Sequence, residues 1–344
     1  MRPPAAERNS RRLPDDRPCA PPVRGAAALA SAKAVSAAAR HFRFGLVVSQ
    51  GESRAQWRDM ARQAEDLGYS TLLVADHFGQ QLAPVPAMLA AAEATTRLRV
   101  GTFVLDNDFR HPAAVAKEAA SVDLLTDGRL ELGIGAGWNA ADYRKTGLSF
   151  DAPGVRVSRL AEALQVISAF FLGGTVTFHG KHYQIDGLDA SPRPVQRPRP
   201  PIMLGANGTR MLRLAAQQAD ILNFPDRPPV GRSTAGNPGL GVSFEQQMAV
   251  VRQAAGSRYP QLELSVLCIP RITDRVGETI DRLATQMETT AEVVQAMPAT
   301  LVGSVQSIVD KLQDNRERFD LSYPVVFAPA MHDFAPVVAR LAGS

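Results

Sequence analysis

A histidine at the end of an apolar segment is the first candidate for chemistry in this chain. His77 follows the run 70–75 and Asp76. Imidazole titrates near neutral pH, so it can donate a hydrogen bond or move a proton during a reaction. A histidine in this place can equally cap the helix that follows. His77 is therefore the candidate catalytic residue, for a reaction that supplies or removes a proton.

Three glycines at alternate positions form the second candidate. Gly133, Gly135 and Gly137 end a short apolar run and precede Trp138 and Asn139. The pattern predicts a buried strand that opens into a loop. Because such a strand end has no side chains, a planar ligand can lie against its backbone. The same spacing also serves close packing of a strand on a helix, so the motif alone is a weak signal.

The third candidate is residues 205–209, which join a predicted strand to a predicted helix. Backbone N–H groups at the start of a helix carry partial positive charge and can bind a phosphate group. The side chains of Asn207 and Thr209 can add donors. The alternative is an ordinary helix N-terminus without a ligand.

The elements that must position these residues alternate between strand and helix. Apolar runs predict strands at 42–49, 70–75, 98–105, 129–134, 202–206, 220–224, 262–269 and 323–328. Helical patterns occupy 54–67, 84–94, 113–125, 155–172, 208–218, 244–255, 280–295, 304–318 and 334–341. Eight such units predict an α/β fold, the (β/α)8 TIM barrel, whose functional groups gather at the carboxyl ends of the strands. A doubly wound sheet is the alternative, and it leaves the late strands unexplained.

Other segments stand outside this alternation. Residues 139–147 resemble a polar turn, and 175–178 with 182–185 predict an insertion hairpin. The Pro/Gly-rich segment 225–241 predicts a mobile loop near the strand ends, of a kind that often covers a site. We assign residues 41–344 to one barrel domain and residues 1–40 to a disordered extension or a start codon set too early.

Charge and cysteine content narrow the class of protein. The net charge of +4 arises in residues 1–40, which hold eight Lys and Arg against three acidic residues. Without a basic helix interleaved with aromatic residues, we expect no nucleic-acid partner. No run approaches the roughly 18 apolar residues that cross a bilayer, so we expect no membrane association. Cys19 and Cys268 fall on a tail and a buried strand, which disfavours a disulfide and fits a cytoplasmic protein.

Taken together, the motifs resemble one family. The order and spacing of four short motifs resemble the bacterial luciferase-like monooxygenase superfamily, and more narrowly its branch that uses the deazaflavin coenzyme F420: Asp76-His77-Phe78, Arg110-His111-Pro112, Asp127-Gly128-Arg129 and Gly133-x-Gly135-x-Gly137-Trp138. The resemblance is good over residues 42–225 and looser beyond.

The resemblance implies a site at the strand ends. It places His77 near the reactive face of the cofactor ring, and a non-prolyl cis peptide bond between Phe103 and Val104 against the middle ring; the alternative is a plain buried strand with Phe103 in the core. It makes 204–209 the loop that holds the cofactor phosphate. It sets Arg227 where a cation can meet the polyglutamate tail, with a solvated loop arginine as the alternative. The cofactor-binding residues are then expected to be Asp76, Phe103, Val104, Asp106, Gly135, Gly137, Trp138, Asn139, Gly205, Ala206, Asn207, Gly208, Thr209, Phe224 and Arg227.

One position departs from the sugar-phosphate dehydrogenases of the F420 branch. Those enzymes have an acidic residue after the glycines, whereas this chain has Trp138. Because tryptophan cannot deliver a proton, we do not expect sugar oxidation of that kind, and a flat apolar wall suits an apolar or aromatic substrate. Alternatively, Trp138 packs under the helix 155–172. Asp142 and Tyr143 are candidate replacements for the missing acid.

The expected function is F420-dependent hydride transfer between C5 of the deazaflavin and a small organic substrate. The first alternative is an FMN-dependent two-component monooxygenase served by a separate cofactor reductase. The second is a barrel that binds the cofactor without turnover. The resemblance also implies a homodimer. No metal site is predicted.

Overall fold

Eight parallel strands form a closed barrel in the computed structural model, which describes residues 40–48, 50–206 and 208–344. The strands are β1 (Gly45–Val47), β2 (Thr71–Val74), β3 (Arg99–Thr102), β5 (Leu130–Gly135), β8 (Ile202–Gly205), β9 (Ile221–Phe224), β10 (Glu263–Leu267) and β13 (Leu321–Phe327). Each pairs in parallel with the next, and β13 pairs back with β1. The barrel prediction is confirmed at all eight strands, and the doubly wound alternative is wrong.

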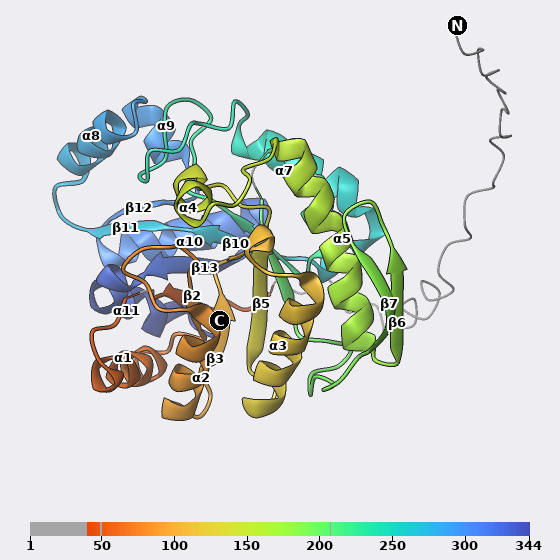
Figure 1. The fold of residues 1–344 in the computed structure, drawn as a ribbon. Helices are drawn as coiled ribbons and strands as arrows, with labels where there is room; N and C mark the ends of the chain where they lie inside the picture. The colour runs from red at the N-terminus through yellow and green to blue at the C-terminus, as the bar shows by residue number, and fades with distance from the viewer. Residues whose placement is uncertain (1–39, 49, 207) are drawn as a thin grey trace, which may run out of the picture. The chain divides into compact units, whose positions relative to one another are not determined.

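Helices cover the outside of the barrel (Figure 1). They are α1 (Arg54–Asp66), α2 (Pro84–Ala94), α3 (Pro112–Leu125), α5 (Pro153–Leu172), α6 (Thr209–Gln218), α7 (Phe244–Ala255), α10 (Val305–Phe319) and α11 (Met331–Leu341). Ser53, Ser243 and Ser304 cap α1, α7 and α10 by accepting from first-turn amides, as serine favours. The main hydrophobic core lies between these helices and the strands, and a smaller cluster around Leu73 and Met203 fills the barrel interior.

Two sequence predictions of local structure are wrong. The polar turn at 139–147 contains a short helix, α4 (Ala140–Thr146), which Asn139 caps and Gly147 ends with φ 75°. The helix predicted at 280–295 is two helices, α8 (Val276–Gln286) and α9 (Ala291–Ala296). Glu288 between them has φ 51°, and the side chain of Thr290 starts α9 by accepting from the amide of Val293. Local capping therefore overrides the helical pattern.

Some strands are shorter than predicted, and others were not predicted. The predicted strand 98–105 stops at Thr102, and β4 (Leu105–Asp106) with a short 3-10 turn (Asn107–Phe109) follows it. Strands β11 (Ile269–Ile272) and β12 (Thr300–Gly303) were not predicted separately; they pair in parallel outside the barrel. The insertion hairpin is confirmed as β6 (Thr175–His179) and β7 (Gln184–Asp189), which pair antiparallel. Two further 3-10 turns span Gly256–Gln261 and Ala328–Ala330.

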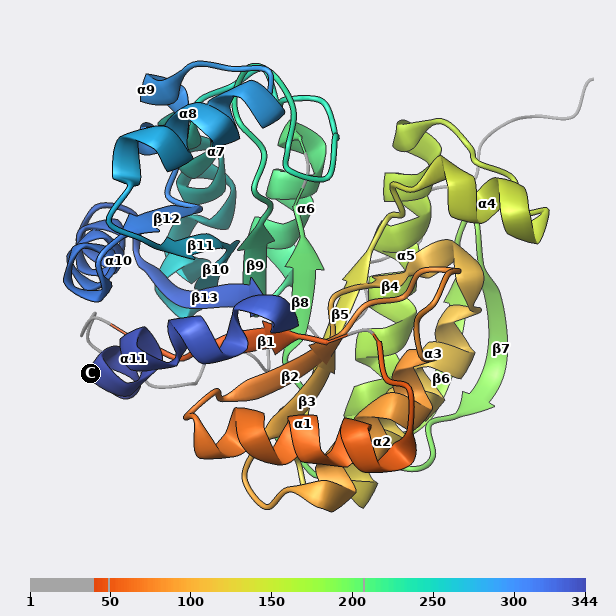
Figure 2. The same ribbon diagram turned by 90° about the vertical axis from the view of Figure 1, so that its left-hand side faces the viewer.

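The inserted elements surround the carboxyl ends of the barrel strands. Figures 1 and 2 both place α4, α8 and α9 at the upper end of the barrel, away from α1 and α2. The segment 225–241 lies among them and has one isolated bridge, between Arg232 and Pro238. Residues 1–39, which include nearly all of the predicted extension and Cys19, are outside the described residues, as is Asn207. Within the described ranges, no helix is long and apolar enough to cross a membrane.

Candidate functional site

A cavity of about 590 Å³ opens at the carboxyl ends of the strands. Residues at or just after the ends of β2, β3, β5, β8 and β9 converge there, although they are far apart in the sequence. The predicted site residues that line it are Asp76, His77, Phe103, Val104, Asp106, Gly135, Gly137, Trp138, Asn139, Gly205, Ala206 and Arg227. The barrel therefore brings most of the predicted set to one place.

His77 is held by a buried carboxylate. Its Nδ1 lies 2.7 Å from Oδ2 of Asp142, whose side chain is 3% exposed. The side-chain amide of Asn139 donates to the same oxygen at 2.9 Å. Because an ionised carboxylate only accepts, Nδ1 of His77 carries the proton and Nε2 is left as the working nitrogen. The sequence suggested Asp142 as a candidate acid. The structure also makes it a positioning residue for His77.

Trp138 forms an apolar wall beside His77. The two rings meet edge to face with centroids 5.3 Å apart, and Trp138 is 49% exposed. The indole is therefore only half buried, and its packing under α5 stays an alternative. Phe78, which follows His77 in the chain, is a second exposed apolar side chain. An apolar or aromatic molecule would find a suitable surface at this rim.

Two carboxylates on the cavity wall have different environments. Asp76 accepts from both terminal nitrogens of Arg110, at 2.6 and 3.1 Å, and from the amide of Asp106. It is therefore fixed as a structural ion pair. Burial raises the pKa of Asp106 to about 6, although the amide of Asp108 and the hydroxyl of Tyr143 donate to it. Asp106 can therefore hold a proton near neutral pH.

The glycines make room for neighbouring backbone and side chains. A Cβ at Gly133 would lie 1.9 Å from the carbonyl oxygen of Thr102, and one at Gly135 would lie 2.9 Å from Val104. Gly137 has φ 75°, and a Cβ there would meet the hydroxyl of Tyr143. The peptide bond between Phe103 and Val104 is cis, as the resemblance implies. Close packing explains these glycines, and it leaves a smooth backbone wall beside Val104.

Several of the described sequence candidates do not line this cavity. Phe224 is 1% exposed and packs against Phe244 in the core, because the last side chain of β9 points outward from the barrel. Gly208 and Thr209 lie at the N-terminus of α6, beside the lining residue Ala206. Asn207 falls outside the described residues. Tyr143, considered as an acid, is fully buried and its hydroxyl donates to Asp106 and Asp108.

Sequence reasoning missed Arg156, the cation nearest the glycine loop. Arg156 lines the cavity and is 6% exposed, with Nη1 donating to the carbonyl of Gly137 at 2.7 Å. Its guanidinium lies 4.0 Å from the ring centroid of Phe150, and its Nε is buried without a hydrogen-bond partner in the described part of the chain. No carboxylate of the described residues forms an ion pair with it. A buried cation in this state is suited to an incoming anion.

A signal for Arg156 was present in the sequence. It lies on the buried face of α5 with Leu160, Ile167 and Phe170. A charged residue within such an apolar stripe is rarely buried without a partner or a ligand. Gln81 was also missed; its amide oxygen is buried at the cavity without a partner among the described residues.

Arg227 joins the segment 225–241 to the cavity. Its Nε donates to the carbonyl of Pro238 at 2.6 Å, and burial lowers its pKa. Asn237 and Pro238 of the same segment line the cavity. The segment thus contributes part of the wall, while its predicted mobility stays a prediction.

Comparison with known proteins agrees with this geometry. The family model described as luciferase-like monooxygenase matches residues 32–230, more than half of the chain. The chain belongs to this family. Its predicted membership of the luciferase-like superfamily is therefore confirmed.

Relatives of the chain are named for two different cofactors. An F420-dependent glucose-6-phosphate dehydrogenase of Microbacterium testaceum is 31% identical over 170 residues, 47% of this chain and 50% of the relative. An FMNH(2)-dependent dimethylsulfone monooxygenase of Pseudomonas putida is 25% identical over 250 residues, 69% of this chain and 65% of the relative. The chain spans about half to two thirds of the length of these family members.

A solved structure supports the fold. The coenzyme F420 dependent tetrahydromethanopterin reductase of Methanopyrus kandleri superposes with a TM-score of 0.71 at 18% identity, over 88% of this chain and 99% of that one. At this identity, the likeness shows the family's barrel and no more.

Proposed function

We propose that the protein is an F420-dependent oxidoreductase, which transfers a hydride between C5 of the deazaflavin and a small organic substrate. The observation that carries the proposal is the His77–Asp142 pair beside a cavity whose lining includes bare glycine backbone and the unpaired cation Arg156. The glucose-6-phosphate dehydrogenase relatives, named as F420-dependent, support the choice of cofactor.

The residues present fit a flat ring with an anionic tail. The backbone at Gly135 and Gly205, with Val104 between them, leaves room for the ring. The start of α6 and Arg156 would hold the phosphate: the carbonyl of Gly154, two residues before Arg156, accepts from Arg210 of α6, so the two helix starts are neighbours. Arg227 would meet the acidic tail. The unpartnered Nε of Arg156 gives this fit an independent physical basis.

His77 would manage the proton that accompanies hydride transfer. When bound, the deazaflavin supplies or accepts the hydride at C5. Nε2 of His77 can take a proton from the substrate or return it, because the hydrogen bond to Asp142 holds the ring with its proton on Nδ1. Asp106, with its raised pKa, is a second group able to hold a proton at the cavity.

The substrate would be apolar or aromatic rather than a sugar phosphate. Trp138 occupies the wall beside His77 and offers no proton. Its exposed indole can pack on a flat or apolar molecule. This specificity separates the proposal from the glucose-6-phosphate dehydrogenase activity that several relatives are named for.

An FMN-dependent two-component monooxygenase is the second candidate. The FMNH(2)-dependent dimethylsulfone monooxygenase relative, which matches over 250 residues, favours it. A phosphate anchor and a bare ring wall suit FMN as well, and a separate reductase would then be required. The homodimer, the cytoplasmic location and the barrel domain 41–344 remain predictions from the sequence.

Cofactor titration tests the proposal. Purified protein is titrated with F420 and with FMN, binding is followed by fluorescence, and turnover is assayed over a panel of apolar ketones, aldehydes and enones with reduced F420. We expect the tighter binding with F420 and turnover of at least one panel member. A several-fold preference for FMN would reject the proposal, and tight F420 binding without turnover would favour a non-catalytic barrel.

A further inference from the structure

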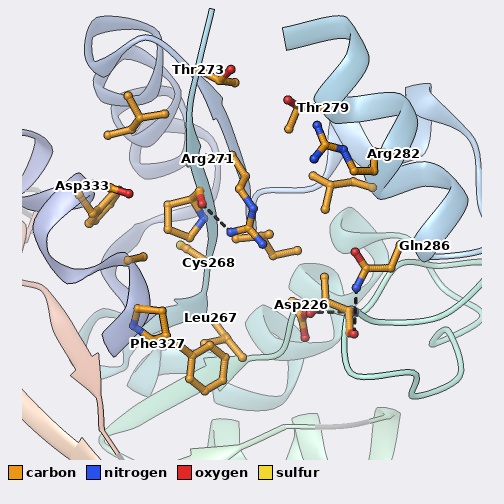
Figure 3. A pocket seen from close by; sticks show the side chains of 18 residues that line it. Asp226, Leu267, Cys268, Arg271, Thr273, Thr279, Arg282, Gln286, Phe327 and Asp333 are labelled. Carbon is orange, nitrogen blue, oxygen red and sulfur yellow. Dashed lines mark hydrogen bonds between the residues drawn. The ribbon is translucent and has the colours of Figure 1, made fainter. Parts of the chain in front are cut away.

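A second cavity, of about 890 Å³, adjoins the first at the ends of β10 and β13. Strand β11, helix α8 and the start of α11 form its walls (Figure 3). Asp226, Leu267 and Phe327 line both cavities. A molecule that reacts beside His77 could therefore extend into the second cavity without crossing the core.

Two arginines face this second cavity from different elements. Figure 3 shows Arg271 of β11 and Arg282 of α8 reaching into the same space. Arg271 donates to the carbonyl of its neighbour Pro270 at 2.7 Å and forms no ion pair with any described residue. Arg282 reaches a carboxylate only at 4.0 Å, that of Glu278 one turn earlier on α8.

Two other arginines near the strand ends are paired more closely: Arg110 lies 2.6 Å from Asp76, and Arg159 lies 2.9 Å from Asp108. Arg271 and Arg282, like Arg156, keep guanidinium donors available to a ligand. The side chain of Arg282 is 71% exposed, so a ligand can reach it from solvent.

The acidic residues of the second cavity do not neutralise the arginine pair. Asp226 accepts from the amide and hydroxyl of Thr234. Asp333 lies in the first turn of α11, where the helix dipole favours a negative charge, and Figure 3 places it across the cavity from Arg282. Thr273 and Thr279 add hydroxyl groups near the arginines.

We propose that Arg271 and Arg282 bind an oxyanion, a carboxylate or phosphate, of a molecule whose other part occupies the catalytic cavity. Planar guanidinium groups on two elements can each offer paired donors to such a group. Leu267 and Phe327 at the junction suit an apolar connecting part. The statement that the rest of this molecule reacts in the first cavity rests on the proposed function. The oxyanion belongs either to the substrate or to the acidic tail of the deazaflavin.

Inorganic phosphate is the first probe of the arginine pair. Calorimetric titration at low ionic strength compares the parent protein with Arg271→Ala, Arg282→Ala, the double variant and Arg275→Ala. Arg275 is the matched control, because its side chain is 79% exposed, close to the 71% of Arg282, and it lies near both arginines in the sequence but does not line the cavity. We expect each single variant to weaken phosphate binding about tenfold, the double variant to abolish it and the control to stay within about twofold.

A second set of titrations identifies the source of the oxyanion. F420 and a deazaflavin lacking the phosphate and acidic tail are each titrated into the parent and the double variant. Weaker binding of F420 alone assigns the arginines to the cofactor tail. Unchanged affinity for both, with phosphate binding lost, assigns them to the substrate.

The proposal is overturned if phosphate binds the double variant as it binds the parent, if the parent binds no phosphate, or if Arg275→Ala causes an equal loss. Failure of the proposed function has a different signature: the parent protein would not bind F420, while the phosphate result would still decide the arginine pair.

Discussion

The two ends of the barrel differ in whether a buried charged side chain has a partner of opposite charge. At the amino-terminal end, the fully buried Glu131 accepts from Arg43 at 2.6 Å, from Arg99 at 2.7 Å and from the hydroxyl of Tyr323 at 3.2 Å. Arg43 also pairs with Glu263 at 2.7 Å. At the carboxyl-terminal end, Arg156 is buried with no carboxylate of the described chain, and the amide oxygen of Gln81 is unpartnered.

The paired charges at the amino-terminal end stabilise the fold, whereas the unpaired groups at the carboxyl-terminal end remain able to bind a ligand. Burial raises the pKa of Glu131, but the attraction of Arg43 and Arg99 outweighs it, so the net pKa is lowered. Burial raises the pKa of Asp106 at the other end, and the hydrogen bonds from the amide of Asp108 and the hydroxyl of Tyr143 do not offset it. The buried carboxylate of Glu131 is thus paired at one end, whereas Arg156 and Gln81 keep unpartnered groups at the other end, beside the candidate site.

Replacing His77 should give the largest functional effect at the carboxyl-terminal end. For His77→Ala, we expect turnover to fall by roughly 10² to 10⁴ and cofactor affinity to change by no more than a few-fold, because a proton-transfer group is lost while the ring wall remains. Steady-state kinetics and cofactor titration measure both quantities. Asp142→Asn should lower turnover less and shift the pH profile, since it acts through His77. Unchanged turnover in His77→Ala would remove this residue from the mechanism.

Removing Glu131 should give the largest stability effect, at the opposite end. Glu131→Ala leaves Arg43 and Arg99 without their shared carboxylate, and breaking a buried ion pair costs about 3 to 5 kcal/mol. Urea denaturation followed by circular dichroism measures the free energy of unfolding. Glu288→Ala is the control, because its partner Arg232 and its own side chain are largely exposed and the change should be below about 1 kcal/mol. Equal effects of the two substitutions would contradict the contrast between the ends.

The two ends should also depend on pH with opposite sign. Asp106 has a folded pKa of about 6, above its unfolded value, so its contribution to stability is present below about pH 4 and is lost as pH rises through 6. Asp106→Asn should therefore match the parent near pH 4 and be more stable at pH 7, by at most about 3 kcal/mol.

Glu131 provides the opposite case. Its pKa is lowered on folding, so its contribution is present above about pH 4.5 and is lost as pH falls through the folded pKa. Glu131→Gln should be least stable relative to the parent at neutral pH, with the gap narrowing in acid. Urea midpoints at several pH values measure both variants. A gap that does not change with pH for Asp106→Asn would show that its carboxyl titrates normally.

The sequence predicted the barrel well because its signals are local and repeated. Each strand is a short apolar run between turn residues, and each helix has its own stripe, so the eight units could be recognised separately. The split between α8 and α9 was missed because it depends on one residue, Glu288, at positive φ. Strand β12 was missed because its pairing with β11 is a tertiary contact.

The site was predicted only in part, because contacts between residues far apart in the sequence leave no local pattern. His77 and the glycines lie at strand ends, where the topology of a barrel fixes their meeting place. The His77–Asp142 contact joins residues 65 positions apart, and no spacing rule indicates it. Phe224 was assigned to the site by its position at a strand end, but the alternation of side chains directs it into the core.

Arg156→Met should give the smallest of these effects, and it tests most directly whether the unpaired cation serves a ligand. Methionine fills much of the volume without charge, and the lost bond to Gly137 should change the free energy of unfolding by no more than about 1 kcal/mol. Binding of F420 should weaken about tenfold, because a charged contact to the phosphate is lost. A deazaflavin without phosphate should bind the parent and the variant equally. If instead the variant loses several kcal/mol of stability and binds F420 normally, Arg156 is a structural charge like Arg43, and the contrast between the two ends fails at its most informative residue.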